Sequence, residues 1–255
     1  MKPSRSLGEL EEERMLPWQN PGLYAAHLAR YRFAGRSAAG RAVLDVGSGE
    51  GYGAAALAEQ ADRVLAIDYS PVAVGHARQK YTRSNLRFEV GDALNLDRSL
   101  RGAFDVVTCF EVLEHIEDGD RLMAGLAAAL RPGGLLYLST PNLLVDSLFE
   151  AAGGHDPNAY HVNLMSPGQL QDLAARHLAE VAVYGQHLRG NAVHSVMKAL
   201  DVANLRHRLV RSRQVQRRLA TGVMGQAEVP SETEFRFSRT LVRQAPQLLL
   251  VGRAR

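Results

Sequence analysis

The sequence is poor in three features that define large classes of protein. It holds one cysteine in 255 residues, Cys109, so no disulfide can form within the chain. No run of 18 apolar residues occurs, which excludes a typical membrane-spanning helix. The opening residues, MKPSRSLGELEEERM, lack the apolar segment of a secretory signal. We therefore expect a cytoplasmic globular protein, in line with its 46% hydrophobic and 22% charged residues.

Lysine is also scarce, since only Lys2, Lys80 and Lys198 are lysine among 30 basic residues. We attribute this arginine bias to genome composition before function. The charge is unevenly placed: residues 186–218 carry eight basic residues and one acid, a net +7, whereas the whole chain is +3 and the remainder is therefore −4. A basic segment of this kind is a clue about binding partners.

The stretch that organises the chain is 42–54, AVLDVGSGEGYGA. A β-forming run is followed by glycines at alternate positions and then by a helix-forming run, which is typical of the ligand-binding corner of a doubly wound α/β fold. The spacing of Gly47, Gly49 and Gly51 is G-x-G-x-G, whereas a dinucleotide site has G-x-G-x-x-G. Asp45, just before the turn, suits a ligand with an ammonium group better than a pyrophosphate. A glycine turn without a ligand is the alternative for this motif taken alone.

The following segments alternate strand and helix, which predicts a parallel sheet. The expected strands are 42–46, 64–67, 86–90, 104–110 and 135–139. Five polar residues lie at or just after their C-terminal ends, where such sheets bind ligands, and should meet there: Asp45, Asp68, Asp92, Glu111 and Thr140. Asp68 is placed to bind ribose hydroxyls; its alternative role as a helix cap is already filled by Ser70.

The pattern loosens after Pro141. We expect a long loop over 141–165, a helix from a Ser166 cap to His177, and further strands at 181–184 and 247–251. The 60 residues of 186–245 are far too many for a hairpin connection, so we interpret them as an insertion, helical over 196–219.

The pattern D-x-G-x-G-x-G resembles motif I of the class I S-adenosylmethionine-dependent methyltransferases. Four later segments resemble the same family in order and spacing: 64–68, Gly91-Asp92-Ala93, FDVVTCFEVLEHI at 104–116 and LRPGGLLYLSTPN at 130–142. Within this family the chain most resembles the branch that contains the ubiquinone-biosynthesis O-methyltransferases and the sugar- or glycan-modifying methyltransferases. The resemblance implies that S-adenosylmethionine is bound by a set of nine residues: Asp45, Gly47, Gly49, Gly51, Asp68, Tyr69, Asp92, Ala93 and Phe110.

The resemblance also implies the architecture: a Rossmann-like, seven-stranded, mostly parallel sheet whose last strand is antiparallel, with a helical insertion before that strand. We expect an N-terminal arm and helix (1–35), the cofactor domain (36–185), a basic helical insertion or lid (186–245) and the last strand (246–255).

Four residues are candidates for catalysis at the rim where the methyl should emerge: His115, His161, Glu111 and Glu114. Neutral imidazole is a suitable acceptor for a hydroxyl proton near pH 7. Either histidine could instead be structural. Glu111, Glu114 and His115 could hold magnesium, as the ubiquinone-type resemblance implies, but they form only a partial magnesium set, so we expect no metal.

We expect O-methylation of a hydroxyl on a small molecule or glycan, which could be phosphorylated. N- or C-methylation of another metabolite, or a non-catalytic S-adenosylmethionine-binding partner subunit, are the alternatives. Three interpretations of the basic insertion stay open: a solvated helix face, a lid or homodimer contact, or a surface for phosphate or peripheral membrane binding. Nucleic acid is disfavoured because no aromatic residues interleave with the arginines.

Overall fold

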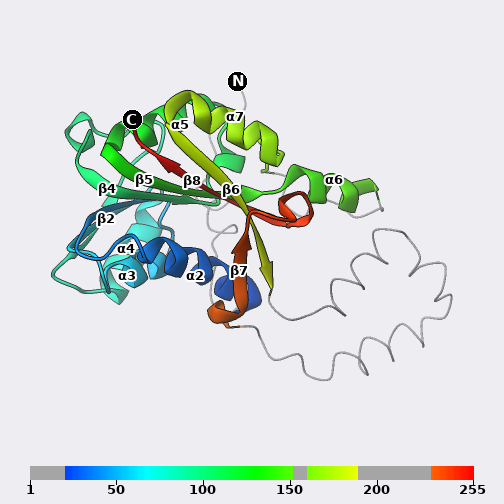
Figure 1. Cartoon of the computed structure of the whole chain (residues 1–255). Helices are drawn as coiled ribbons and strands as arrows, with labels where there is room; N and C mark the ends of the chain where they lie inside the picture. Colours follow the sequence, from blue (N-terminus) through cyan, green and yellow to red (C-terminus); the bar gives the residue numbers. More distant parts are fainter. Residues whose placement is uncertain (1–20, 152–159, 189–230) are drawn as a thin grey trace, which may run out of the picture.

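A computed structural model describes residues 21–151, 160–188 and 231–255, and Figure 1 traces the chain through them. Strands and helices alternate as the sequence predicts. The strands are β1 (Ala42–Val46), β2 (Arg63–Asp68), β3 (Leu86–Val90), β4 (Phe104–Phe110), β5 (Leu130–Pro141), β6 (Glu180–Leu188), β7 (Phe235–Ser238) and β8 (Gln247–Arg253). The α-helices are α2 (Pro21–Gly35), α3 (Tyr52–Leu57), α4 (Pro71–Lys80), α5 (Gly119–Ala129), α6 (Leu143–Ala151) and α7 (Pro167–His177). The 3-10 segments are η1 (Arg98–Leu100), η2 (Leu113–His115), η3 (Glu232–Glu234) and η4 (Val242–Gln244).

The described strands form one sheet in the order β3-β2-β1-β4-β5-β8-β6-β7. Strands β1 to β5 pair in parallel, and β8 runs antiparallel to both of its neighbours, β5 and β6. The predicted doubly wound, mostly parallel sheet with an antiparallel last strand is therefore confirmed. The sheet exceeds the expected seven strands by β7, a short strand that pairs with β6 at the sheet edge.

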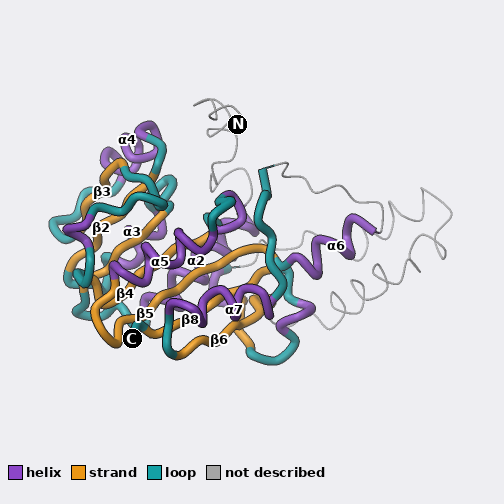
Figure 2. The backbone as a smooth tube through the Cα atoms, turned by 90° about the horizontal axis from the view of Figure 1, so that it is seen from above, coloured by secondary structure: helices purple, strands orange, loops and turns teal. Residues whose placement is uncertain are grey.

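Helices cover both faces of this sheet (Figure 1). Helices α2, α3 and α4 lie on one face, and α5 and α7 lie on the other; the view from above shows α7 beside β6 and β8 (Figure 2). Each face has its own apolar core. Leu126, Leu138 and Leu170 belong to the core under α5 and α7, while Tyr31 and Leu249 belong to the core under α2 and α3.

The helix starts follow the expected cap signals. The Ser70 hydroxyl accepts from the amide of Ala73, and Pro71 opens α4. Ser166 and Gln169 form a reciprocal capping box at the start of α7. These caps fix where the two helices leave the C-terminal side of the sheet.

The expectation of an irregular loop over 141–165 is wrong in its first part, because α6 occupies Leu143–Ala151. Asn142 starts this helix: its side-chain oxygen accepts from the amide of Leu144 over 3.1 Å. Several other expectations, namely the N-terminal arm, the helix at 196–219 and most of the basic insertion, lie outside the described residues. Strand β6 continues to Leu188, two residues beyond Gln186, where the insertion was predicted to start.

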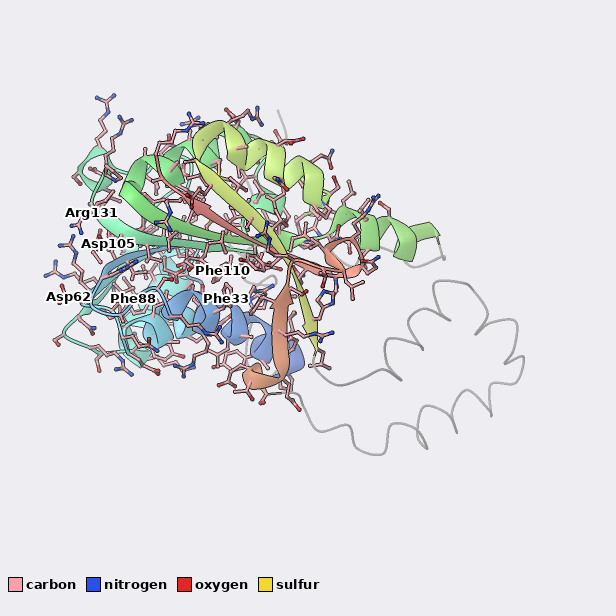
Figure 3. The ribbon with its side chains drawn as sticks, in the orientation of Figure 1. Phe33, Asp62, Phe88, Asp105, Phe110 and Arg131 are labelled. Atoms are coloured by element: carbon pink, nitrogen blue, oxygen red, sulfur yellow. The ribbon has the colours of Figure 1, made fainter. Side chains whose placement is uncertain are left out.

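Polar residues also close the opposite edge of the sheet, where the strands begin. Arg131 donates to Asp105 Oδ1 over 2.8 Å, and Figure 3 shows these two side chains together at that edge. The other oxygen of Asp105 accepts from the amide of Ala42 over 2.9 Å. This edge is thus tied together by its own residues, and Phe110, labelled in the same view, marks the far end of β4. None of the described helices combines the length and apolar character that crossing a membrane requires.

Candidate functional site

The glycine turn after β1 has the backbone that its sequence predicts. Gly47, Gly49 and Gly51 have φ of 77°, 51° and 80°, a region that favours glycine. A Cβ at Gly47 would lie 2.3 Å from Val112, so this glycine lets the segment after β4 approach. A Cβ at Gly49 would meet no atom within 4 Å, so the backbone there is open to a ligand. The turn therefore presents an open face at Gly49 at the C-terminal edge of the sheet, while the amides of Gly47, Gly49 and Gly51 donate within the protein.

Asp68 ties this turn to the end of β2. One carboxylate oxygen accepts from the amide of Gly49 over 2.7 Å, and the other accepts from the amide of Ser70 over 2.9 Å. These two bonds hold the Asp68 carboxylate beside the turn, and carboxylate oxygens are acceptors of the kind that ribose hydroxyls use. Tyr69, the next residue, is 66% exposed, although large hydrophobic side chains are usually covered. This pair leaves a polar and an aromatic surface side by side beside the turn.

Asp92 follows β3 and is half-buried. Its two oxygens accept from the amide of Leu94 and from the side chain of Asn95, so its carboxylate faces its own turn. The amide of Gly91 donates to the carbonyl of Asp68 over 3.0 Å, which brings the two turns together. The structure thus places Asp68, Asp92 and the half-buried Ala93 at one edge.

Asp45 is fully buried and supports the turn from below. Its carboxylate accepts from the hydroxyl of Thr108 over 2.7 Å and from the hydroxyl of Tyr31 over 3.3 Å. Burial raises the pKa of Asp45 to about 7; the hydrogen bonds from Thr108 and Tyr31 oppose this rise, and the nearby Asp68 charge adds to it. Phe110, also buried, packs its ring edge against Tyr31 at 4.8 Å between centroids. Asp45 and Phe110 therefore shape the site from within the core.

Helix α2 contributes a residue that the sequence analysis missed. Arg30 is fully buried, and Nη1 lies 3.4 Å from Glu111 Oε1. None of its three side-chain nitrogens donates a hydrogen bond to any described residue. A buried guanidinium in this state is suited to bind an anion. The expected cofactor carries a carboxylate on its amino-acid part, so the residues present fit that group.

Glu111 is held in an unusual conformation at the end of β4. Its φ of 56° lies in the left-handed region, which side chains other than glycine rarely adopt. Its carboxylate accepts from the hydroxyl of Ser139 over 2.6 Å, and its amide donates to the carbonyl of Ser139. Such local strain is typical of functional sites. With Arg30 and Ser139 as partners, Glu111 is oriented toward the α2 side of the sheet.

The two predicted histidines come together although they are 46 positions apart. The ring centroids of His115 and His161 are 5.3 Å apart. The loop that carries His161 is attached to η2, because the amides of Val162 and Asn163 both donate to the carbonyl of Glu114, over 2.8 and 3.0 Å. The side chain of Asn163 also donates to the carbonyl of Ile116 over 2.9 Å. The pair is thus positioned by main-chain contacts between two segments that follow β4 and β5.

Glu114 lies next to the two histidines. It is 1% exposed, and Oε2 accepts no hydrogen bond from the described residues. Burial raises the pKa of its carboxyl well above the usual range, and the charge of Glu111 raises it further. One ligand atom each from Glu114, His115 and His161 lies within 4.8 Å of the others. This set differs from the one considered for magnesium, since Glu111 is engaged elsewhere; two imidazoles and one carboxylate suit zinc, manganese or iron better than magnesium.

A second group on α2 and α3 was also absent from the sequence-based set. His27 Nδ1 lies 3.0 Å from the hydroxyl of Tyr52, the residue after Gly51. Burial lowers the pKa of His27 well below its usual range, and the charge of Arg30 acts in the same direction. His27 is therefore neutral at physiological pH, and it anchors the start of α3 to α2.

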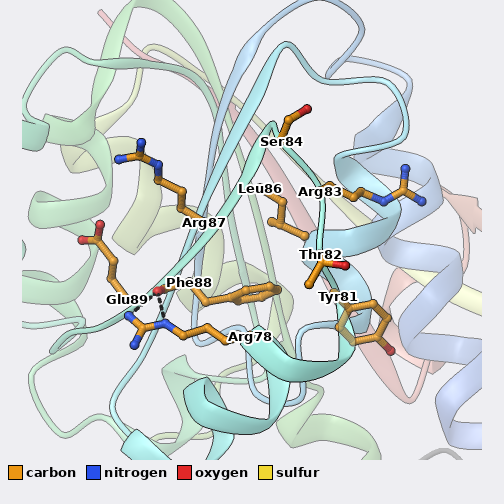
Figure 4. A pocket seen from close by; sticks show the side chains of 9 residues that line it. All are labelled: Arg78, Tyr81, Thr82, Arg83, Ser84, Leu86, Arg87, Phe88 and Glu89. Carbon is orange, nitrogen blue, oxygen red and sulfur yellow. Dashed lines mark hydrogen bonds between the residues drawn. The ribbon is translucent and has the colours of Figure 1, made fainter.

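One hollow among the described residues lies away from this site. A groove of about 610 Å³ runs between α4 and β3, and Figure 4 shows Arg78, Arg83 and Arg87 along it. The guanidinium of Arg78 donates twice to the carbonyl of Phe88, over 2.8 and 2.6 Å. Arg78 thus covers an outward-facing carbonyl of the edge strand, which is one way in which proteins protect sheet edges.

Comparison with known proteins agrees with this geometry. The family described as "Methyltransferase domain" matches residues 19–177. A probable S-adenosylmethionine-dependent methyltransferase of Mycolicibacterium smegmatis is 34% identical over 151 residues, 59% of this chain and 56% of the relative. A ubiquinone biosynthesis O-methyltransferase of Xanthomonas axonopodis pv. citri is 40% identical over 106 residues, 41% of this chain and 44% of the relative. The chain thus spans about half the length of the curated relatives it matches.

Solved structures share the fold over nearly the whole chain. The N-methyltransferase NodS of Bradyrhizobium japonicum, in complex with S-adenosyl-L-homocysteine, is similar with a TM-score of 0.60 and 20% identity, covering 97% of each chain. The putative methyltransferase in a complex with the Haloferax volcanii Trm112 activator has a TM-score of 0.61 and 18% identity, covering 99% of each chain. At these identities the likeness concerns the fold alone.

Proposed function

The chain belongs to the class I S-adenosylmethionine-dependent methyltransferases, and we propose that it methylates a hydroxyl oxygen of a small molecule or glycan. The cofactor supplies a methyl group on a positively charged sulfur, which is already a good leaving centre. The work left to the protein is to bind the cofactor, align the acceptor, exclude water and take up the hydroxyl proton.

The histidine pair is the observation that carries this proposal. His115 and His161 follow β4 and β5 and lie 5.3 Å apart between ring centroids. An oxygen nucleophile benefits from a base because an un-ionised hydroxyl is a weak nucleophile. A neutral imidazole can accept that proton near pH 7 at a ring nitrogen. With the pair at the ligand-binding edge of the sheet, one imidazole can act as base while the other orients the hydroxyl.

Cofactor binding is assigned in this proposal to residues on both sides of the glycine turn. Asp68 would bind the ribose, with the open face at Gly49 against the nucleoside and Tyr69, Asp92 and Ala93 beside its base. Arg30 would bind the carboxylate of the amino-acid part, because its guanidinium is buried and makes no hydrogen bond to the described residues. Asp45, Gly47, Gly51 and Phe110 would shape this surface from beneath.

N-methylation is the second candidate, because NodS, an N-methyltransferase by its title, shares the fold. An amine that is neutral needs no base of this kind, so the histidine pair favours oxygen. The curated ubiquinone biosynthesis O-methyltransferases support the same choice, although the chain covers less than half of their length.

The test is transfer of labelled methyl from S-adenosylmethionine to a panel of alcohols, phenols, sugars and amines. We expect label in the oxygen acceptors, with loss of turnover in His115→Ala and His161→Ala. His177→Ala, on α7 and bound to Asp120 over 3.0 Å, is the matched control. Label found only in amines, at rates that both histidine variants retain, would contradict the proposal.

A further inference from the structure

A row of buried polar groups lies beneath α2 at the C-terminal edge of the sheet. Gln186 of β6 and Gln247 of β8 are directly paired across the antiparallel strands. Residues that face each other in this way point their side chains to the same face. That face is the α2 face, because Gln186 Nε2 donates to the carbonyl of Ala26 over 2.8 Å. We call Gln186 and Gln247 the glutamine pair.

Each member of the glutamine pair has a buried carboxamide oxygen that accepts no hydrogen bond from the described residues. The bond to Ala26 identifies the nitrogen of the Gln186 side chain, and so also its oxygen. Gln186 is 3% exposed. A buried acceptor without a donor destabilises a protein, and here two of them are neighbours. The structure thus presents a place where two donors would be stabilising.

The glutamine pair lies close to the site described above. Arg30 is one helical turn after Ala26, so its side chain leaves α2 on the same side. Its partner Glu111 is bound by Ser139 of β5. Two residues further along β5, Pro141 pairs with Gln247. Gln247 as a residue is half-buried, so the β8 end of the pair reaches the surface of the described residues, whereas both carboxamide oxygens are covered.

We propose that the glutamine pair is an acceptor subsite that binds two hydroxyl groups of a polyhydroxylated molecule such as a sugar. The assignment rests on the proposed function, since it names the class of acceptor for that site. Carboxamide oxygens accept hydrogen bonds, and ring hydroxyls donate them. The Cβ atoms of directly opposed residues are about 4.5–5.5 Å apart, a spacing that two hydroxyls of one ring can bridge. A phenol with one hydroxyl could satisfy only one of the two oxygens.

Binding is tested without any transfer step. The side-chain amide signals of ¹⁵N-labelled glutamine are followed while methyl α-D-mannopyranoside, methyl α-D-glucopyranoside or phenol is added in the presence of S-adenosylhomocysteine. Gln247→Met keeps the size of the side chain and removes its oxygen; Gln79→Met, exposed on α4, is the matched control. We expect the signals of the glutamine pair to shift with a glycoside and not with phenol, and affinity to fall at least about tenfold in Gln247→Met only. Unchanged signals at saturating glycoside would mean that ordered water alone fills the place, and would overturn the subsite.

Transfer separates the subsite from the proposed function. Wild-type kcat/KM should fall at least about tenfold for a deoxy glycoside that lacks one bound hydroxyl, and this penalty should nearly vanish in Gln247→Met. Glycosides that bind at the pair but receive no methyl on oxygen would contradict the proposed function and support the subsite. O-methylation of simple phenols, with equal kcat/KM in wild type and Gln247→Met and no deoxy penalty, would support the function and overturn the subsite.

Discussion

The ring of Tyr31 occupies the space that a side chain at Gly53 would need. A Cβ at Gly53 would lie 2.0 Å from Cζ of Tyr31. The last glycine of the G-x-G-x-G-x-G stretch therefore serves the packing of α2 against α3. This packing brings the Tyr31 hydroxyl to Asp45 and Arg30 to Glu111. The glycine motif thus contributes to the site in two ways: its turn leaves an open face at Gly49, and Gly53 lets α2 pack closely against α3.

Replacing Gly53 by alanine should displace Tyr31 and loosen α2. Overpacking of this kind costs about 1–3 kcal/mol, which lowers the melting temperature by several degrees in a protein of this size. Affinity for S-adenosylhomocysteine should fall as well. Gly75→Ala on α4 is the control: no atom lies within 4 Å of its added Cβ, so we expect no loss of stability or affinity. Thermal unfolding gives the melting temperature of both variants, and calorimetry gives their affinity for S-adenosylhomocysteine. A Gly53→Ala protein with wild-type values of both would refute the packing argument.

Arg30→Met should weaken cofactor binding. The loss of a hydrogen bond to a charged partner is worth about 1.5–3 kcal/mol, or roughly 10- to 150-fold in affinity. Isothermal titration with S-adenosylhomocysteine gives the value. The affinity of Arg30→Lys should lie between those of wild type and Arg30→Met. Arg36→Met, which changes an exposed residue just after α2, should bind like wild type. Wild-type affinity in a folded Arg30→Met protein would show that Arg30 holds no part of the cofactor.

The raised pKa of Asp45 makes stability depend on pH. The folded value of about 7 exceeds the reference value of 3.8, so the protonated form favours folding. That contribution is fully present below about pH 3.8 and is lost as pH rises through about 7. Asp45→Asn keeps an oxygen for Tyr31 and Thr108 and removes this dependence. Urea unfolding without cofactor should show the variant more stable at pH 8, by up to about 4 kcal/mol, and equal to wild type near pH 4. A less stable variant at pH 8 would contradict the assignment.

His115→Ala and His161→Ala should each lower turnover by about 10²–10⁴-fold with little change in cofactor affinity, the usual size of a general-base contribution. Asp68→Ala should instead weaken cofactor binding first, because Asp68 lies beside the glycine turn. Initial rates with an acceptor from the labelled-methyl panel, together with calorimetry, distinguish the two effects. Full turnover in both histidine variants would mean that alignment alone drives the reaction.

Treatment with EDTA should leave turnover unchanged, since the proposed base needs no metal. The contrary result has a defined meaning. If EDTA abolishes activity and zinc, manganese or iron(II) restores it, then Glu114, His115 and His161 are metal ligands, and Glu114→Gln should abolish the rescue. If magnesium restores turnover instead, and Glu111→Gln prevents that restoration, then Glu111 is a metal ligand as considered in the sequence analysis.

The strands could be predicted closely because short apolar runs end at clear turn signals, as at Gly47 and Gly91. Helix α6 was missed although its signal was present: Asn142 is a strong N-cap residue, followed by LLVDSLFEA. The irregular appearance of 141–165 as a whole concealed that local cap. Extra length at the ends of β5 and β6 was missed because pairing with neighbouring strands extends both beyond their apolar cores: β5 pairs with β4 at Leu130 and with β8 to Pro141, and β6 pairs with β7 to Leu188.

The site was predictable where it follows strand ends and unpredictable where it comes from α2. Chain order alone put His115 and His161 on one edge. Arg30 carried no such signal, because an arginine on an N-terminal helix is ordinarily solvated. Its burial depends on the contact of Tyr31 with Gly53, two residues that no local pattern relates. The contact between Glu111 and Arg30 likewise depends on tertiary packing alone.

The position of β8 gives the sheet an obligatory order of assembly. β8 is synthesised after β6 and β7, yet it lies between β5 and β6. While the ribosome makes residues 142–246, the edge of β5 that later pairs with β8 stays open, and β6 can pair only with β7. An open strand edge of this kind invites pairing with other chains, so nascent protein is exposed to aggregation until residue 253 has emerged. A fragment ending at residue 245 would contain the glycine turn and both histidines. Without β8, its β5 would keep an unpaired edge that can pair with other chains.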